Sequence, residues 1–302
     1  MNPEFLRGTD VAVSRRSART YTPQRATQKL NEVIAMSEFP SDVEYDERGE
    51  GPAVLLLPGS FGTGSGWKVL TDRLTRSYRI VTTSLLGYGA TTERRPLGNA
   101  TMRQQTEVID CILERIGEPA HVVGHSFGGL AALAHAIEGV IKPASLMLVE
   151  ANPLGLLKTS GEARLYAMFG EMTRDYFAEF ESGRPDAARH VIDFYGGEGT
   201  FASFPAKVRD YVIKTTPANI RDWSSGTPFE PPLSAYHQIA ATTLVVRGGD
   251  GHPAMMRIAE ILAEAIPHGR LETVAGGSHF LPATNPAELA RLLDAHVDPG
   301  II

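Results

Sequence analysis

The feature that most constrains the fold is a glycine-rich hexapeptide, GHSFGG, at residues 124–129. It matches the pattern Gly-x-Ser-x-Gly, follows an apolar run at residues 120–123 and precedes a small, apolar stretch at 127–137. A serine held in a sharp turn between a strand and a helix has a strained backbone, so its neighbours must lack bulky side chains. Gly124 and Gly128 meet this requirement, and Gly129 would let the helix approach the sheet closely. The hexapeptide therefore predicts that Ser126 is a nucleophile on a strand–turn–helix unit.

The rest of the chain repeats this alternation of strand and helix. We predict strands at residues 53–57, 78–83, 120–123, 144–149, 242–247 and 270–274, and helices at 102–116, 127–137, 253–265 and 286–296. Continuous apolar runs are typical of parallel strands buried on both faces, with helices as the crossovers. The pattern predicts an α/β fold with a mostly parallel central sheet flanked by helices.

Residues 151–240 interrupt the alternation. Proline, glycine and aromatic residues are frequent there, and helical stretches such as 162–180 follow one another without strands between them. We expect an inserted helical cap at 151–240, on a core that is formed by residues 39–150 and 241–302.

The N-terminal segment differs in composition from the rest. Residues 1–35 carry six basic and three acidic side chains and lack apolar periodicity. We expect residues 1–38 to be a leader: a disordered arm, a targeting peptide or sequence left from cloning, with a native start near Met36. Residues 1–35 therefore carry a net charge of +3 and residues 36–302 carry −9, which together give the net charge of −6. This balance argues against a nucleic-acid-binding protein and disfavours strongly anionic substrates.

Several other classes of protein and site are disfavoured. No apolar run reaches the ~20 residues that span a bilayer. The single cysteine, Cys111, is predicted to be a core residue in a protein of the reducing cytoplasm. Spacings for metal ligands are missing, and the glycines at 62, 64 and 66 fit no phosphate-binding pattern. We therefore expect no metal and no cofactor, and leave homo-oligomerisation open.

A serine nucleophile needs an adjacent base. Of nine histidines, His279 has the right place in the chain, in the glycine-rich segment GGSHF after the last predicted strand. His125 lies inside the hexapeptide, and we expect its side chain to point away from the reacting centre. We keep it, with Phe61 and Trp67, as a candidate substrate contact.

Residues 44–296 resemble the α/β-hydrolase fold enzymes, in particular capped members similar to esterases and lipases. The resemblance rests on LLLPGSFGTGSGW at 55–67, GYG at 87–89, the hexapeptide, TTLVVRGGD at 242–250 and GGSHFLP at 276–282, which follow the family's order. It implies that Ser126 is the nucleophile and His279 the base. It also implies an oxyanion hole formed by the backbone N–H groups of Ser60 and Phe127.

The resemblance leaves two candidates for the acid that orients the base. Asp250 follows the strand before the last, but the usual Gly-x-x-Asp spacing counted from Gly248 ends at Gly251. Glu150 ends the strand after the nucleophile helix, which is a second location in the family. Both positions keep the order serine, acid, histidine, and we favour Glu150.

The resemblance implies a serine hydrolase that cleaves an ester-like bond of a small or medium organic substrate through an acyl-enzyme. A serine at position 126 disfavours the haloalkane dehalogenases and epoxide hydrolases, which use a carboxylate there. Fold and motifs leave five alternatives open. These are a lactonase, a thioesterase, a carbon–carbon bond hydrolase, a cofactor-free perhydrolase, and a ligand-binding protein or receptor without catalysis.

Overall fold

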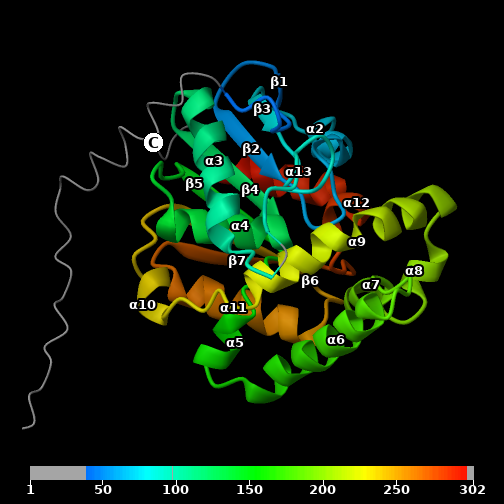
Figure 1. Cartoon of the computed structure of the whole chain (residues 1–302). Coiled ribbons are helices and arrows are strands. Elements are labelled where there is room, and N and C mark those ends of the chain that lie inside the picture. The colour runs from blue at the N-terminus through cyan, green and yellow to red at the C-terminus, as the bar shows by residue number, and fades with distance from the viewer. Residues whose placement is uncertain (1–38, 97, 298–302) are drawn as a thin grey trace, which may run out of the picture. The chain divides into compact units, whose positions relative to one another are not determined.

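The computed structural model describes residues 39–96 and 98–297; the predicted leader, residues 1–38, lies outside the described residues. Seven strands form one sheet in the order β1-β3-β2-β4-β5-β6-β7 (Figure 1). Only β1 is antiparallel to its neighbour, β3. The bounds are β1 Asp46–Arg48, β2 Ala53–Leu57, β3 Arg79–Thr82, β4 Ala120–His125, β5 Ser145–Val149, β6 Thr242–Gly248 and β7 Gly269–Val274. The predicted mostly parallel sheet is confirmed, and the sequence analysis missed β1.

The central strands are apolar because both of their faces are covered. All five residues of β2 are buried. Successive side chains of a strand point to opposite faces, so Leu55 and Leu57 join one hydrophobic cluster and Val54 and Leu56 join a second. Strand β1 has no such signal, because its three residues, Asp-Glu-Arg, are exposed.

Helices cover each face. On the first face lie α3 Met102–Ile116, α4 Phe127–Glu138 and α11 Pro253–Ala265, whose apolar residues share the cluster of Leu55. On the second face lie η1 Gly64–Trp67, α2 Lys68–Thr71, α12 Leu281–Thr284 and α13 Pro286–His296. Figure 1 shows α3 and α4 in front of the sheet and α13 behind it.

The chain between β5 and β6 forms six helices and no strand, and every residue of it is described. These are α5 Gly155–Thr159, α6 Ala163–Glu181, α7 Arg189–Gly196, α8 Thr200–Ser203, α9 Ala206–Gly226 and α10 Leu233–Tyr236. They lie within residues 151–240, where the sequence predicts a cap, and we refer to them as the cap helices. Among all the helices at residues 39–96 and 98–297, none is long and apolar enough to cross a membrane.

The register of the parallel strands determines where the site lies. Leu57 pairs with Gly124, His125 with Val149, and Val149 with Val246. The carboxyl ends of β2, β4, β5 and β6 therefore meet at one edge of the sheet. Ligands of open α/β sheets bind at this edge, and the segments that follow these strands carry most of the candidate residues.

Candidate active site

Ser126 occupies the turn between β4 and α4 in a conformation that most residues avoid. Its φ is 51° and its ψ is −118°. The turn leaves no room for side chains beside it. A Cβ at Gly124 would lie 2.4 Å from the carbonyl oxygen of Gly128, and a Cβ at Gly128 would lie 2.3 Å from that of Pro58. The glycines of the hexapeptide are therefore required by close backbone approaches, as the sequence pattern indicates.

A chain of hydrogen bonds joins Ser126, His279 and Glu150. The Nδ1 atom of His279 lies 3.1 Å from Oε2 of Glu150. Because a carboxylate accepts hydrogen bonds, Nδ1 carries the proton and Nε2 presents a lone pair. The hydroxyl of Ser126 donates to this Nε2 at 2.9 Å. The side chains of His279 and Glu150 are 4% and 0% exposed, so the chain of bonds is shielded from water.

The surroundings of Glu150 fix its carboxylate in place. Its second oxygen, Oε1, accepts the backbone N–H of Gly248 at 2.7 Å, and its own N–H donates to Val246 at 2.8 Å. Asp250, the other candidate acid, is exposed, and its N–H donates to Gly277. The structure therefore brings Glu150, and not Asp250, to the imidazole of His279.

Backbone strain concentrates at this edge of the sheet. Within the described part of the chain, three residues other than glycine have positive φ: Phe61 at 62°, Ser126 at 51° and Glu150 at 48°. Such conformations cost on the order of 1–3 kcal/mol each and gather at functional sites. They lie in the loop after β2, in the turn after β4 and at the end of β5.

The ring of His279 is held from two sides. Tyr195 of α7 stacks on it, with ring centroids 3.9 Å apart and planes 9° apart. His125 donates from Nε2 to the backbone carbonyl of His279 at 2.8 Å. Burial, together with the nearby His279, lowers the pKa of His125 to about 3, so this imidazole stays neutral. The expectation that His125 points away from the reacting centre is corrected, because it borders the same cavity.

A small cavity of about 70 Å³ lies over Ser126. Phe61 and His125, two of the three candidate substrate contacts, line it. Trp67 does not; it packs with Leu70 in the hydrophobic cluster on the far face of the sheet. The full lining comprises Ser60, Phe61, His125, Ser126, Asn152, Val191, Ile192, Tyr195, Asn219, Trp223, His279 and Phe280.

Ser60 is linked to a buried acid in the cap. Its hydroxyl donates to Oδ2 of Asp222, in α9, at 2.6 Å. Tyr88 donates to the same oxygen at 2.6 Å, and Arg95 donates to Oδ1 at 2.6 Å. Burial raises the pKa of Asp222, and the charge of Arg95 together with these hydrogen bonds opposes the rise. The loop after β2 is therefore tied to the cap.

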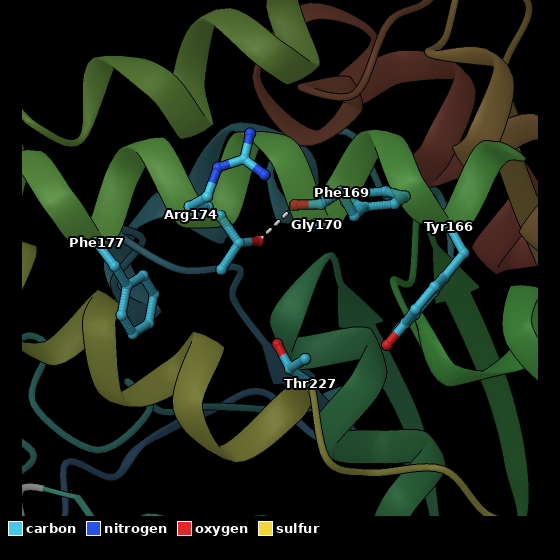
Figure 2. A pocket seen from close by; sticks show the side chains of 7 residues that line it. Tyr166, Phe169, Gly170, Arg174, Phe177 and Thr227 are labelled. Atoms are coloured by element: carbon cyan, nitrogen blue, oxygen red, sulfur yellow. Dashed lines mark hydrogen bonds between the residues drawn. The ribbon is translucent and has the colours of Figure 1, made fainter. Parts of the chain in front are cut away.

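A larger cavity, of about 300 Å³, lies elsewhere in the cap region (Figure 2). Its lining comprises Tyr166, Phe169, Gly170, Thr173, Arg174, Phe177 and Thr227. It is mostly apolar, and its only acid–base side chains are those of Tyr166 and Arg174. Among residues 39–96 and 98–297, no three His, Cys, Asp or Glu side chains gather as a metal site would require.

The sequence analysis missed four residues at the site: Asn152, Tyr195, Asn219 and Asp222. Asn152 follows Glu150 by two residues at a strand end, and this position could have marked it. The other three belong to the cap, where only tertiary packing brings them to the core. No local signal marks Asp222, because its helix also carries other charged residues such as Arg209, Asp210 and Arg221.

The comparisons with known proteins agree with this fold. The model of the alpha/beta hydrolase family matches residues 54–292. The chain belongs to this family. Its resemblance to the α/β-hydrolase fold, inferred from the motifs, is confirmed, and its coarse class is that of the hydrolases.

Individual relatives of this alpha/beta hydrolase are distant. A putative non-heme bromoperoxidase, BpoC, of Mycobacterium tuberculosis is 26% identical over 79% of this chain and 91% of its own length. The dihydrolipoyllysine-residue acetyltransferase component of the acetoin cleaving system of Cupriavidus necator is 33% identical over 115 residues. That match covers 37% of this chain and only 30% of the relative.

Solved structures share the fold. An esterase from Thermogutta terrifontis has a TM-score of 0.66, at 20% identity, over 86% of this chain and 94% of its own. At this identity the likeness concerns the fold alone.

Proposed function

We propose that this alpha/beta hydrolase is a serine hydrolase that cleaves ester-like bonds of small or medium organic substrates. The observation that carries the proposal is the unbroken chain of hydrogen bonds from Ser126 through His279 to Glu150, with distances of 2.9 and 3.1 Å. A nucleophile, a base and an acid that orients the base are the three parts of a hydrolytic triad.

In the first half of the reaction, Nε2 of His279 takes the proton of the Ser126 hydroxyl while the oxygen attacks the ester carbonyl carbon. The carbonyl π bond opens and its electron pair moves to the oxygen, which becomes an oxyanion. When the tetrahedral intermediate collapses, the bond to the alcohol oxygen breaks and His279 returns the proton to that oxygen. The alcohol leaves, and the acyl group stays bound to Ser126.

In the second half, water replaces the alcohol. His279 takes one proton of the water while its oxygen attacks the acyl carbon. Collapse of the second tetrahedral intermediate breaks the bond to Ser126, whose oxygen regains the proton from His279. The products are a carboxylic acid and the free enzyme. Glu150 stabilises the imidazolium that forms in both halves and holds the imidazole in one orientation.

The oxyanion of each intermediate needs backbone donors. We assign this role to the N–H groups of Phe127 and Ser60. Phe127 is the first residue of α4, where N–H groups have no acceptor inside the helix and form the positive end of its dipole. Ser60 borders the cavity beside Ser126. Donors placed for the developing charge are worth about 2.7–4 kcal/mol each in related chemistry.

The proposal is tested with short-chain 4-nitrophenyl esters on the wild-type protein and on Ser126→Ala. We expect wild-type turnover with an initial burst of 4-nitrophenol, and a fall in kcat of at least about 10³-fold in the variant. Equal rates for the two proteins would contradict the proposal. A folded wild-type protein without turnover would instead favour the non-catalytic ligand-binding protein.

A further inference from the structure

Two asparagine side chains border the cavity over Ser126 and approach it from different parts of the chain. Asn152 follows β5 in the core, and Asn219 lies in α9 of the cap. Their exposed fractions are 7% and 1%, so neither side chain has free access to bulk water. Asparagine at such depth needs hydrogen-bond partners.

Each amide is held at one end by a tyrosine hydroxyl. Nδ2 of Asn152 donates to the hydroxyl of Tyr195 at 3.2 Å. The hydroxyl of Tyr176 donates to Oδ1 of Asn219 at 2.8 Å. Both tyrosines are themselves buried, which fixes the positions of the two amides.

The other end of each amide has no partner. Oδ1 of Asn152 and Nδ2 of Asn219 are buried and make no hydrogen bond in the structure. A buried polar atom left unpaired costs about 1–3 kcal/mol. Together the two asparagines have one unpaired acceptor and one unpaired donor, which is the pair that a hydroxyl group satisfies.

The charges around the cavity select against anions. None of the twelve described residues that line it is a lysine or an arginine. The adjoining recess shares Ser60, Asn152 and Trp223 with the cavity and is also lined by Asp222. The nearby Arg95 already pairs with Asp222 and Glu93, so it offers no free cation to a substrate. The chain after residue 35 has a net charge of −9 as well. A carboxylate on the substrate would lose its hydration without gaining a cation.

The position of Asn152 indicates which part of the substrate is recognised. The recess beside it is also lined by Ser60 and Phe127, the two residues to which we assign the oxyanion hole. The alcohol oxygen must lie near His279, which protonates it. We place the acyl part on the side of the recess, toward Asn152.

We infer that the preferred substrate is a neutral ester whose acyl part carries a hydroxyl group, bound between Asn152 and Asn219. This inference rests on the proposed serine hydrolase function and names its substrate class. The two asparagines act as specificity-determining residues, because a substrate without the hydroxyl leaves their amide atoms unpaired.

Three esters of equal chain length test the inference: 4-nitrophenyl butanoate, 4-nitrophenyl 3-hydroxybutanoate and mono-4-nitrophenyl succinate. We expect kcat/KM to be at least about tenfold higher for the hydroxy ester than for the butanoate, and lowest for the anionic succinate. Equal values for the first two esters, or a preference for the succinate, would overturn the inference.

Variants of Asn152 and Asn219 test whether these two side chains cause the preference for the hydroxy ester. In Asn219→Ala and Asn152→Ala, the ratio of kcat/KM for hydroxy ester to butanoate should fall toward 1. In Asn99→Ala, a substitution at an exposed loop asparagine, the ratio should stay as in the wild type. Because Asn219→Ala removes a partner of Tyr176, Asn219→Asp serves as a second variant that keeps this acceptor and lacks the amide donor. A wild-type ratio in the asparagine variants would contradict the assignment.

The readouts separate this inference from the proposed function. If the folded wild-type protein hydrolyses none of the three esters, the hydrolase proposal is wrong. Turnover of all three esters at similar rates means that the hydrolase proposal stands and that the substrate inference is wrong.

Discussion

Glu150 supports the site with both oxygens of one carboxylate. One oxygen accepts the N–H of the His279 ring, and the other accepts the backbone N–H of Gly248 in the neighbouring strand. The residue has positive φ, so the end of β5 turns sharply to present the side chain. The proposed acid is thus placed by the strand that follows α4, not by the loop that contains Asp250.

Substitutions of Glu150 and Asp250 distinguish between the two candidate acids. Glu150→Gln should lower kcat by about 10³–10⁴-fold, because a neutral amide neither stabilises the imidazolium nor fixes its tautomer. Asp250→Asn, at an exposed position, should change kcat less than about threefold. The measurement is steady-state hydrolysis of a 4-nitrophenyl ester by both variants. Loss of turnover in Asp250→Asn alone would show that the assignment of the acid is wrong.

At the scale of elements, helix α9 joins the cap to the core. It carries Asn219 and Trp223 at the cavity and Asp222 beneath the loop after β2. The side chain of Arg95, which pairs with Asp222, is 0% exposed and that of Asp222 is 2% exposed. Removing one partner of such a buried pair leaves an uncompensated charge and is strongly destabilising.

The second prediction concerns this connection. Ser60→Ala deletes the hydroxyl that donates to Asp222 and keeps the backbone N–H, so the loop loses an anchor and the oxyanion donor is retained. Without this anchor, the loop holds the backbone N–H of Ser60 less firmly. Because this N–H is proposed to act mainly in the transition state, we expect kcat to fall by about 3–10-fold with KM nearly unchanged. Ester kinetics measure both constants.

Ser65→Ala, at an exposed position in η1, which follows this loop, is the matched control and should behave as the wild type. An increase in KM at constant kcat for Ser60→Ala would contradict the proposed role of the loop.

The third prediction concerns stability in acid and involves α13. His296 near its end is buried, and burial lowers its pKa from 6.5 to about 4. The unfolded chain therefore binds more protons between these pH values, and folding stability falls as the pH drops below 6.5. This group alone should remove about 2 kcal/mol of the free energy of unfolding by pH 4.5.

Urea unfolding at pH 7 and pH 4.5 measures this effect. The loss between the two pH values should be smaller in His296→Gln than in the wild type, because glutamine does not titrate. An equal loss in both proteins would mean that other groups cause the acid sensitivity.

For the whole molecule, the sequence predicted the sheet better than it predicted the cavity. Buried parallel strands such as β2 are continuous apolar runs, and the elbow around Ser126 follows from local glycine requirements. Strand β1 has no apolar signal, so only its pairing with β3 defines it. Trp67 follows the loop after β2 in the sequence, but its side chain packs on the opposite face of the sheet.

The site residues of the cap helices show why the rest of the cavity could not be predicted from the sequence. Tyr195 and Asn219 reach His279 and the cavity only because two cap helices pack over the carboxyl edge of the sheet. Their partners lie 43 or more positions away in the chain. A pattern of local periodicity contains no information on contacts at such separations.

In the proposed triad, Ser126 is a nucleophile activated by His279 and Glu150. A fluorophosphonate probe tests it most directly, because such probes react with activated serines. After incubation with the probe, intact mass and peptide mapping should show one adduct, on Ser126, in the wild-type protein. Glu150→Gln should react far more slowly, and Ser126→Ala should not react. A folded wild-type protein that stays unlabelled, or that carries the adduct on another residue, would show that Ser126 is not the activated nucleophile.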